Sequence, residues 1–244
     1  MKKIGLLLCF SVFLLGKAEA QKGIRFGFQS SPTWSWLKTS DPKIEGVSSN
    51  WGLKVGAICE YYFEENYALT TGLGFGLNQG GSLQNGYPAW KPWDKADLAA
   101  IPSDTFGLNS KLHYGVTYVE IPFGLKMRGG SNEDSRVKFY AELPIFTLGF
   151  VTKASGNILG TADQNLNDVN IREEVKGISL SWGLGGGIEY ELATNTRLVA
   201  GLAFQKQFTD LTRNGSVEES PNKWVKEDSK GTFGSIALKI GVFF

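Results

Sequence analysis

Large apolar residues and small or polar residues alternate with a period of two along most of the chain. Between Trp51 and Phe63, one face holds Trp51, Leu53 and Val55, while the other holds glycines and the charged Lys54 and Glu60. This period is that of a β-strand. The same alternation recurs in seven further segments: 24–29, 67–78, 118–128, 137–150, 178–192, 198–205 and 235–244. The pattern therefore predicts an all-β chain with eight strands.

The links between these strands alternate strictly in length. The short links 64–66, 129–135 and 193–196 separate long polar links at 30–50, 79–111, 154–176 and 209–231. Consecutive antiparallel strands would place every short turn at one end and every long loop at the other, as in outer-membrane barrels. We therefore predict an eight-stranded antiparallel up-and-down transmembrane β-barrel in the cell outer membrane, with turns and termini in the periplasm.

A soluble lipocalin-like barrel is the alternative, since it also has eight strands and follows a signal peptide. Such a barrel buries its apolar face and shows polar residues to water. Here the polar face is rich in glycine and serine, which suit the narrow, filled lumen of an eight-stranded barrel. This composition favours the membrane barrel.

The first residues have the layout of a secretory signal. Lys2 and Lys3 precede an apolar run over 4–15, and Ala18-Glu19-Ala20 is a small-x-small cleavage site. We expect a cleaved signal peptide at 1–20, containing Cys9, and a barrel domain at 21–244. The apolar run is too short for a membrane-spanning helix, which needs about 20 residues.

Composition narrows the chemistry further. The chain has 25 basic and 24 acidic residues, for a formal net charge of +1, which argues against a nucleic-acid partner held by bulk charge. It has one His and two Cys, which nearly excludes a zinc site. We predict no metal ion and no cofactor.

A set of charged residues falls on the face that we assign to the lumen. Its members are Arg25, Lys54, Glu60, Glu120, Lys126, Arg128, Lys138, Glu142, Glu189, Glu191 and Lys239. Buried charges must pair or lose their charge, and near-equal numbers of each sign indicate a mutually neutralised plug. The alternatives are an ion pathway, or acid–base work by Glu189 and Glu191.

No catalytic residues are predicted. Paired glycosidase carboxylates need an open cleft, whereas this lumen should be packed. A Ser-His-Asp triad would have to use His113, the only histidine. Some eight-stranded outer-membrane barrels are lipid acyltransferases, which keeps an enzyme as a minor alternative.

Two prolines interrupt the fourth and fifth strands. Pro122 and Pro144 both lie on the lumen phase, and the alternation slips after Pro144. Because proline cannot donate to a ladder, we expect a bulge at Pro144 and a local break in pairing between these two strands. Bulges that tune curvature are favoured over a functional gate.

The second long link contains an aromatic and proline-rich stretch. Tyr87, Trp90 and Trp93 lie there beside Pro88 and Pro92, and we predict that they form a recognition surface. Trp34 and Trp36 could equally belong to the interfacial aromatic girdle.

Phe244 ends the last strand on the apolar face. It is expected to be a signal for the barrel-assembly machinery, which together with outer-membrane lipid is an expected partner.

One strand also resembles a known family. Tyr118-Val119-Glu120-Ile121-Pro122-Phe123-Gly124-Leu125-Lys126 resembles the Y-x-E-I-P-x-x-L-K stretch of PorT-family outer-membrane β-barrels. Gln207-Phe208-Thr209-Asp210-Leu211 is similar to the G-L-T-[DN]-[IL] strand end of that family, with Gln and Phe replacing Gly and Leu. The resemblance implies an exported barrel of a Gram-negative envelope and, through the family's namesake, a link to type IX protein secretion.

Two functions therefore follow from the sequence. One is a non-enzymatic scaffold or component of an envelope complex, of which the type IX secretion machinery is one example. The other is a surface barrel that binds an external protein or glycan through its long loops.

Overall fold

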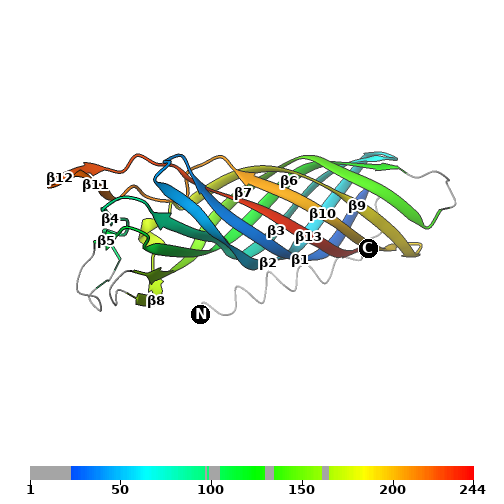
Figure 1. Cartoon of the computed structure of the whole chain (residues 1–244). Coiled ribbons are helices and arrows are strands. Elements are labelled where there is room, and N and C mark those ends of the chain that lie inside the picture. The colour runs from blue at the N-terminus through cyan, green and yellow to red at the C-terminus, as the bar shows by residue number, and fades with distance from the viewer. Residues whose placement is uncertain (1–22, 97, 99–104, 130–134, 161–164) are drawn as a thin grey trace, which may run out of the picture.

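Eight long strands form a closed antiparallel barrel in the computed structural model of the protein (Figure 1), which describes residues 23–96, 98, 105–129, 135–160 and 165–244. The strands are β1 (Ile24–Thr39), β2 (Ile44–Glu64), β3 (Tyr67–Asn85), β6 (Lys111–Gly129), β7 (Val137–Leu159), β9 (Ile178–Ala193), β10 (Thr196–Gln207) and β13 (Gly231–Phe243). Each pairs with the next along the chain, and β13 pairs with β1 to close the ring. This confirms the predicted up-and-down topology. The expected signal peptide lies outside the described residues.

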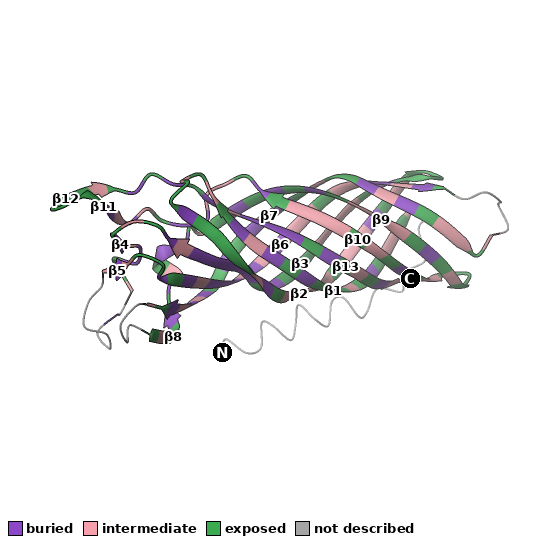
Figure 2. Cartoon of the chain, in the orientation of Figure 1, coloured by how far each residue is buried: buried purple, intermediate pink, exposed green. Residues whose placement is uncertain are grey.

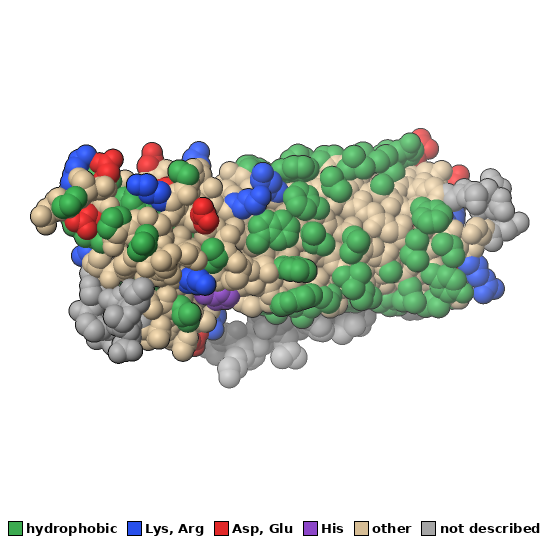
Figure 3. Space-filling model, in the orientation of Figure 1, with side chains coloured by type: hydrophobic (Ala, Val, Ile, Leu, Met, Phe, Trp, Pro, Cys, Tyr) green, Lys and Arg blue, Asp and Glu red, His purple; other side chains and the backbone are tan. Residues whose placement is uncertain are grey.

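The outer wall on the side of the short turns is an apolar belt. Its side chains are large, hydrophobic and exposed, as in Phe28, Trp51 and Leu202, which are 66%, 70% and 59% exposed. The belt covers most of the turn side of the barrel wall in Figure 3, whereas charged side chains gather on the loop side and at the rim beside the short turns. An exposed apolar band around a closed barrel is the surface that faces lipid.

In the belt region, small residues on the inward face of the strands leave room for large side chains that fill the lumen. At Gly201, a Cβ atom would lie 2.3 Å from the Tyr140 hydroxyl oxygen. A larger residue at this position would displace the tyrosine, which is buried inside the barrel. The glycine-rich lumen phase predicted from the sequence is therefore a packing requirement.

The polarity of the two faces reverses on the side of the long loops. On β6, Leu112, Tyr114 and Val116 point inward and are buried, while Lys111 is exposed and His113 half-buried. The strands continue through this region, so β1 and β2 leave only residues 40–43 between them. The predicted long link at 30–50 is thus wrong, because its residues keep the strand period with the opposite polarity.

Shorter elements lie among the loops. β4 (Ala89–Lys91), β5 (Phe106–Gly107), β11 (Ser216–Ser220) and β12 (Lys223–Lys226) form a four-stranded sheet in the order β12-β11-β4-β5. β8 (Asn165–Asn170) pairs with β7, and a 3₁₀ helix, η1, follows at Arg172–Glu174. These elements gather at one end of the barrel (Figure 1), where buried positions are dense (Figure 2).

The two prolines act on different ladders. The β7–β9 register shifts between Glu142 and Ile145, which confirms the bulge expected at Pro144. Pro122 pairs with Thr147 of β7, and it is the β3 ladder that skips Ile121 and Pro122. The β6–β7 register also shifts between Gly124 and Lys126, opposite Pro144, which confirms the predicted local break between the fourth and fifth strands. The same ladder shifts again between Thr117 and Tyr118, whereas Pro122 interrupts the ladder with the third strand.

Candidate functional site

The centre of the lumen network is Lys126, which lies between carboxylates from two other strands. Its Nζ atom is 2.6 Å from Glu60 Oε1 and also forms an ion pair with Glu189. All three side chains are almost fully buried. Inward phases on β2, β6 and β9 bring these residues together, because the ring closes around a narrow lumen.

Two arginines extend this cluster toward the short turns. Nη1 of Arg128 and Nη1 of Arg197 each lie 3.6 Å from Glu189 Oε2. Arg197 was not predicted, since the expected strand began at Leu198. It lies two residues before Val199, which points into the lumen, so extending the same phase by one step would have identified it.

Aromatic rings complete the packing around the cations. Lys126 Nζ is 4.6 Å from the centroid of the Tyr140 ring, and the Arg25 and Arg128 guanidinium groups lie 4.5 and 4.7 Å from that of Tyr62. A ring face attracts a cation, and the attraction is stronger away from water. Carboxylates thus pair with part of the positive charge of this cluster, and aromatic rings pack against the remaining cations.

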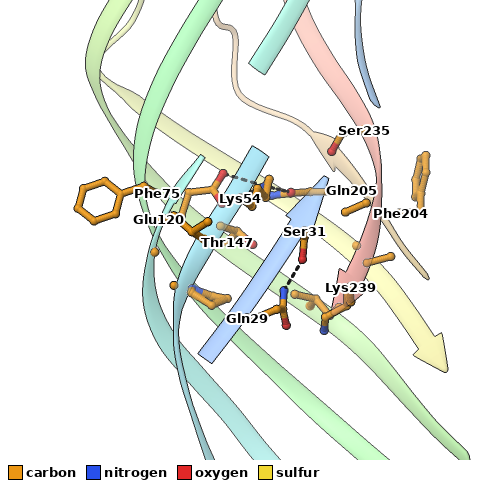
Figure 4. A pocket seen from close by; sticks show the side chains of 18 residues that line it. Gln29, Ser31, Lys54, Phe75, Glu120, Thr147, Phe204, Gln205, Ser235 and Lys239 are labelled. Atoms are coloured by element: carbon orange, nitrogen blue, oxygen red, sulfur yellow. Dashed lines mark hydrogen bonds and ion pairs between the residues drawn. The ribbon is translucent and has the colours of Figure 1, made fainter. Parts of the chain in front are cut away.

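A second layer of charges lies further along the lumen. Lys54 Nζ is 2.9 Å from both Glu120 carboxylate oxygens and also contacts Gln205, and Lys239 pairs with Glu142. Lys54, Glu120, Gln205 and Lys239 border a cavity of about 110 Å³, which Figure 4 shows with Lys54 between Glu120 and Gln205. The buried Ser235 hydroxyl also lines this cavity and has no hydrogen-bond partner among the described residues. The second layer therefore encloses a small space that is lined in part by polar groups.

The predicted lumen residues do not all enter ion pairs. Those that do are Lys54, Glu60, Glu120, Lys126, Arg128, Glu142, Glu189 and Lys239. Arg25 stacks on Tyr62, whereas Lys138 and Glu191 are half-buried near the short turns and have no salt bridge to any described residue. This geometry holds opposite charges together in the barrel interior. Within the described residues, no group of three or more His, Cys, Asp or Glu side chains is arranged to hold a metal ion.

The two tryptophans of the second loop are buried, which corrects the expectation of an exposed aromatic surface there. Trp90 and Trp93 are each 2% exposed. The Trp90 indole N–H donates to Glu227 Oε2 at 2.7 Å, and the Trp93 indole N–H donates to the Tyr114 hydroxyl at 3.0 Å. Large rings in the loop are used to fill the space above the lumen, so they are not available as contact surfaces.

These tryptophans belong to a hydrophobic cluster that closes the loop side, which we call the loop-end core. Its buried members are Leu37, Ile44, Leu83, Trp90, Trp93, Leu98, Phe106, Leu112, Tyr114, Val116, Tyr118, Val151, Ala154, Ile158, Val169, Ile171, Val175, Leu211, Val217 and Phe233. They come from barrel strands and from all three long loops. The loop side is therefore a folded unit with its own core.

Tyr87 lies at the edge of the loop-end core. It is half-buried, and its hydroxyl donates to Asp41 Oδ2 at 2.8 Å while Lys43 Nζ lies 4.7 Å from its ring centroid. Burial and the hydrogen bond to Asp41 raise the pKa of Tyr87 to about 12, so the phenol keeps its proton at neutral pH. Tyr87 thus fastens the second loop to the β1–β2 hairpin.

Two buried carboxylates fasten the loops to one another. Glu227, after β12, accepts hydrogen bonds from Trp90 in β4 and from Ser229. Glu174, in η1, accepts one from the backbone N–H of Lys95. Burial raises the pKa of each carboxyl group.

Phe244 lies at the end of the belt beside the short turns. Its backbone N–H donates to the Phe26 carbonyl oxygen at 2.8 Å, and its side chain is 58% exposed. The terminal ring is therefore accessible on the outward face of the barrel.

The closed ring, its apolar belt and its filled lumen define the class of a transmembrane β-barrel of the outer membrane. The chain belongs to the outer membrane protein beta-barrel domain family, whose sequence model matches residues 18–209. The protein is located in the cell outer membrane. In barrels of this class the long loops commonly face the outside of the cell. No helix among the described residues is long and apolar enough to cross a membrane.

Several solved structures are similar in fold. A major outer membrane protein from Thermus thermophilus is 14% identical, with 91% of this chain and 98% of that chain covered and a TM-score of 0.44. OprG from Pseudomonas aeruginosa is 10% identical, with 91% and 96% covered and a TM-score of 0.42. Neisserial surface protein A is 13% identical, with 89% and 95% covered and a TM-score of 0.40. Among curated proteins, none matches the chain.

Proposed function

We propose that the protein is a non-enzymatic, non-conducting barrel that serves as a scaffold or component of an envelope complex. The observation that supports this is the double closure of the lumen, by the ion-pair network around Lys126 and by the loop-end core. A barrel filled at two levels is poorly suited to transport solutes. Its function then belongs to its outer surfaces.

The loop end is well suited to hold a partner. Its loops are joined by the Trp90–Glu227 and Lys95–Glu174 hydrogen bonds over a common core. A surface that is already ordered loses less conformational entropy when it binds. We propose that this end, and not the lumen, is where the complex is assembled.

A second candidate is recognition of an external protein or glycan. Trp224 in β12 is 43% exposed, and Lys91 Nζ lies 5.5 Å from its ring centroid. An exposed tryptophan on an ordered loop sheet is the type of residue that dominates binding interfaces. It replaces Trp90 and Trp93 as the candidate contact residue.

The test is recovery of the protein from native membranes. Cross-linked membranes are extracted in mild detergent, and the protein is captured with an antibody and analysed by mass spectrometry. The matched variant replaces β11–β12 (216–226) with a short glycine–serine turn, and heat-dependent migration on a gel verifies that its barrel has formed.

We expect stoichiometric envelope proteins with the wild type and fewer with the variant. Type IX secretion components among them would support the role suggested by the PorT-like strand. A lone monomer in both cases would contradict the scaffold proposal and favour the external ligand.

A further inference from the structure

The outer wall of the β1–β2 hairpin has an open groove where the apolar belt ends. We call it the hairpin groove. It has a volume of about 840 Å³ and is lined chiefly by Trp34, Trp36, Lys38, Glu45, Val47 and Ile236. This size lies within the range of small-molecule sites in proteins, about 300–1,000 Å³.

The lower part of the groove is continuous with the lipid-facing belt. Trp34 is 50% exposed and stacks on Trp51, with 5.6 Å between the ring centroids, and it is paired with Ile236 of β13. Tryptophans on barrel walls concentrate at the membrane–water boundary. This part of the groove therefore lies where the membrane–water boundary is expected.

The upper part of the groove is polar. Lys38 is exposed and forms no ion pair with any described residue, and Glu45 and Ser49 lie nearby in the lining. The Asp41 carboxylate accepts hydrogen bonds from the Tyr87 hydroxyl and from the backbone N–H of Lys43, at 2.8 Å each. This part of the hairpin has two basic and two acidic residues, Lys38, Asp41, Lys43 and Glu45, so its net charge is zero. An anionic group would therefore be held by the position of Lys38 and not by the net charge of this part of the hairpin.

We propose that the hairpin groove binds a phosphorylated glycolipid of the outer leaflet. An acyl chain would lie against Trp34 and Ile236, the sugar beside Trp36 and Glu45, and a phosphate on Lys38. The amphiphilic lining fits a molecule that itself crosses the membrane boundary. A water-soluble protein partner would reach only the polar half.

The chain offers a matched control on another part of the wall. Lys206 of β10 is exposed and pairs in register with Trp182 of β9, which is 40% exposed. These two residues repeat the tryptophan and lysine chemistry at the belt edge but do not line the hairpin groove. A general attraction of lipid to the aromatic girdle would involve both pairs equally.

The experiment counts bound lipids by native mass spectrometry on the full chain. The protein is reconstituted in phosphatidylcholine nanodiscs that contain bisphosphorylated lipid A, or its dephosphorylated form. The variants are Trp34→Ala with Lys38→Gln, the control Trp182→Ala with Lys206→Gln, and Lys38→Gln alone. Heat-dependent gel migration verifies folding, and the single change of an exposed lysine should leave it intact.

We expect the amount of bound lipid A to fall about fivefold or more in the variant Trp34→Ala with Lys38→Gln. The reason is that one basic residue near an anionic surface contributes about 1 kcal/mol. The control should retain it as the wild type does, and dephosphorylated lipid A should bind weakly. Equal loss in groove and control variants, or no loss with Lys38→Gln, would overturn the proposal. Equal binding of the dephosphorylated lipid would refute the phosphate contact.

Discussion

Lys126 illustrates how single residues hold this lumen together. Its ammonium group contacts Glu60 and Glu189 and lies over the rings of Tyr140 and Phe243, and its side chain is almost fully buried. Removing one partner of a buried ion pair leaves an uncompensated charge, which costs about 3–5 kcal/mol. The two carboxylates would then repel each other as well.

We therefore expect Lys126→Met to lower the free energy of unfolding by about 3–5 kcal/mol. Urea titration in detergent, followed by heat-dependent gel migration, measures this. The control is Lys138→Met, which removes a lumen-phase lysine that has no salt bridge to the described residues and should change stability by less than about 1 kcal/mol. Equal losses in the two variants would show that charge pairing at Lys126 is not the cause.

The buried carboxyl group of Glu227 should make the stability of the loop end depend on pH. Burial raises its carboxyl pKa above the ordinary value of 4.5, so the folded state holds the proton more tightly than the unfolded state. The cost of burying the ionised group is absent below pH 4.5 and grows as pH rises through the folded pKa. Loop-end stability should fall as pH rises through this window, and Glu174 acts in the same direction.

Hydrogen–deuterium exchange of residues 216–230, corrected for the intrinsic pH dependence of exchange, tests this. We expect protection to decrease with rising pH in the wild type. Glu227→Gln retains a carbonyl oxygen that can accept the Trp90 hydrogen bond but cannot titrate, so its pH slope should be shallower. An unchanged slope would assign the effect to other groups.

At the scale of elements, the loop-end core explains why the buried tryptophans matter. Trp90 and Trp93 join β4 and the second loop to Glu227 and Tyr114. Truncating a buried tryptophan to alanine removes its contacts and leaves a cavity, at a cost of about 3–5 kcal/mol. Trp90 and Trp93 contact no residue of the belt in these hydrogen bonds, so we expect the belt region to form without them.

We expect Trp93→Ala to expose the loop end to proteases while the belt region still assembles. Limited proteolysis with mapping of the cleavage sites, together with heat-dependent migration of the barrel, measures both effects. Trp224→Ala is the matched control, because that residue is 43% exposed and lies outside the loop-end core, so its loss should cost less than about 1 kcal/mol. If Trp93→Ala prevented barrel assembly, the loop end and barrel would fold as one unit.

The sequence was most informative where the membrane imposes the pattern. Trp51, Phe75 and Leu202 face lipid while Lys54 and Glu120 face a narrow lumen, so a period of two identified the strands and the inward charges. Above the belt, water surrounds the wall and the core lies inside, as Leu37 and Lys38 show. The polarity is reversed there, and polar outward residues were interpreted as loops.

The pairing of particular charges could not be predicted for a different physical reason. Phase indicates that Glu60, Lys126 and Glu189 point inward, but contact among them depends on the shear of the closed ring. The alternation also placed Glu191 in the lumen charge network, although it makes no salt bridge to the described residues. It did not indicate that the Tyr62 ring packs against Arg25 and Arg128. Which inward side chains contact one another is determined by how the ring closes, and no local sequence pattern encodes that closure.

At the scale of the whole molecule, the barrel combines two units of opposite polarity along one axis. The belt region has an apolar exterior and a charged interior, whereas the loop end has a polar exterior and an apolar interior. The lumen is closed at two levels, by the ion-pair network around Lys126 and by the loop-end core, which we call the two seals. The cavity beside Lys54 lies between them. Each seal alone would close the lumen, and each belongs to a separately ordered set of residues.

This arrangement predicts how conductance depends on the two seals. In planar bilayers the wild-type protein should give no steady channel current. Replacing residues 86–110 by a short glycine–serine linker should leave it closed, because the Lys126 network remains. Changing Glu60, Lys126 and Glu189 together to alanine should also leave it closed, because the loop-end core remains.

Only the combined variant should conduct, provided that heat-dependent migration shows an assembled barrel. Two seals in series block a pathway as long as either is intact, so the two changes should be strongly non-additive. A stable current from the wild type would refute the closed lumen and favour a porin-like role. A current from either single variant would show that the remaining seal is permeable, and would identify which one closes the barrel.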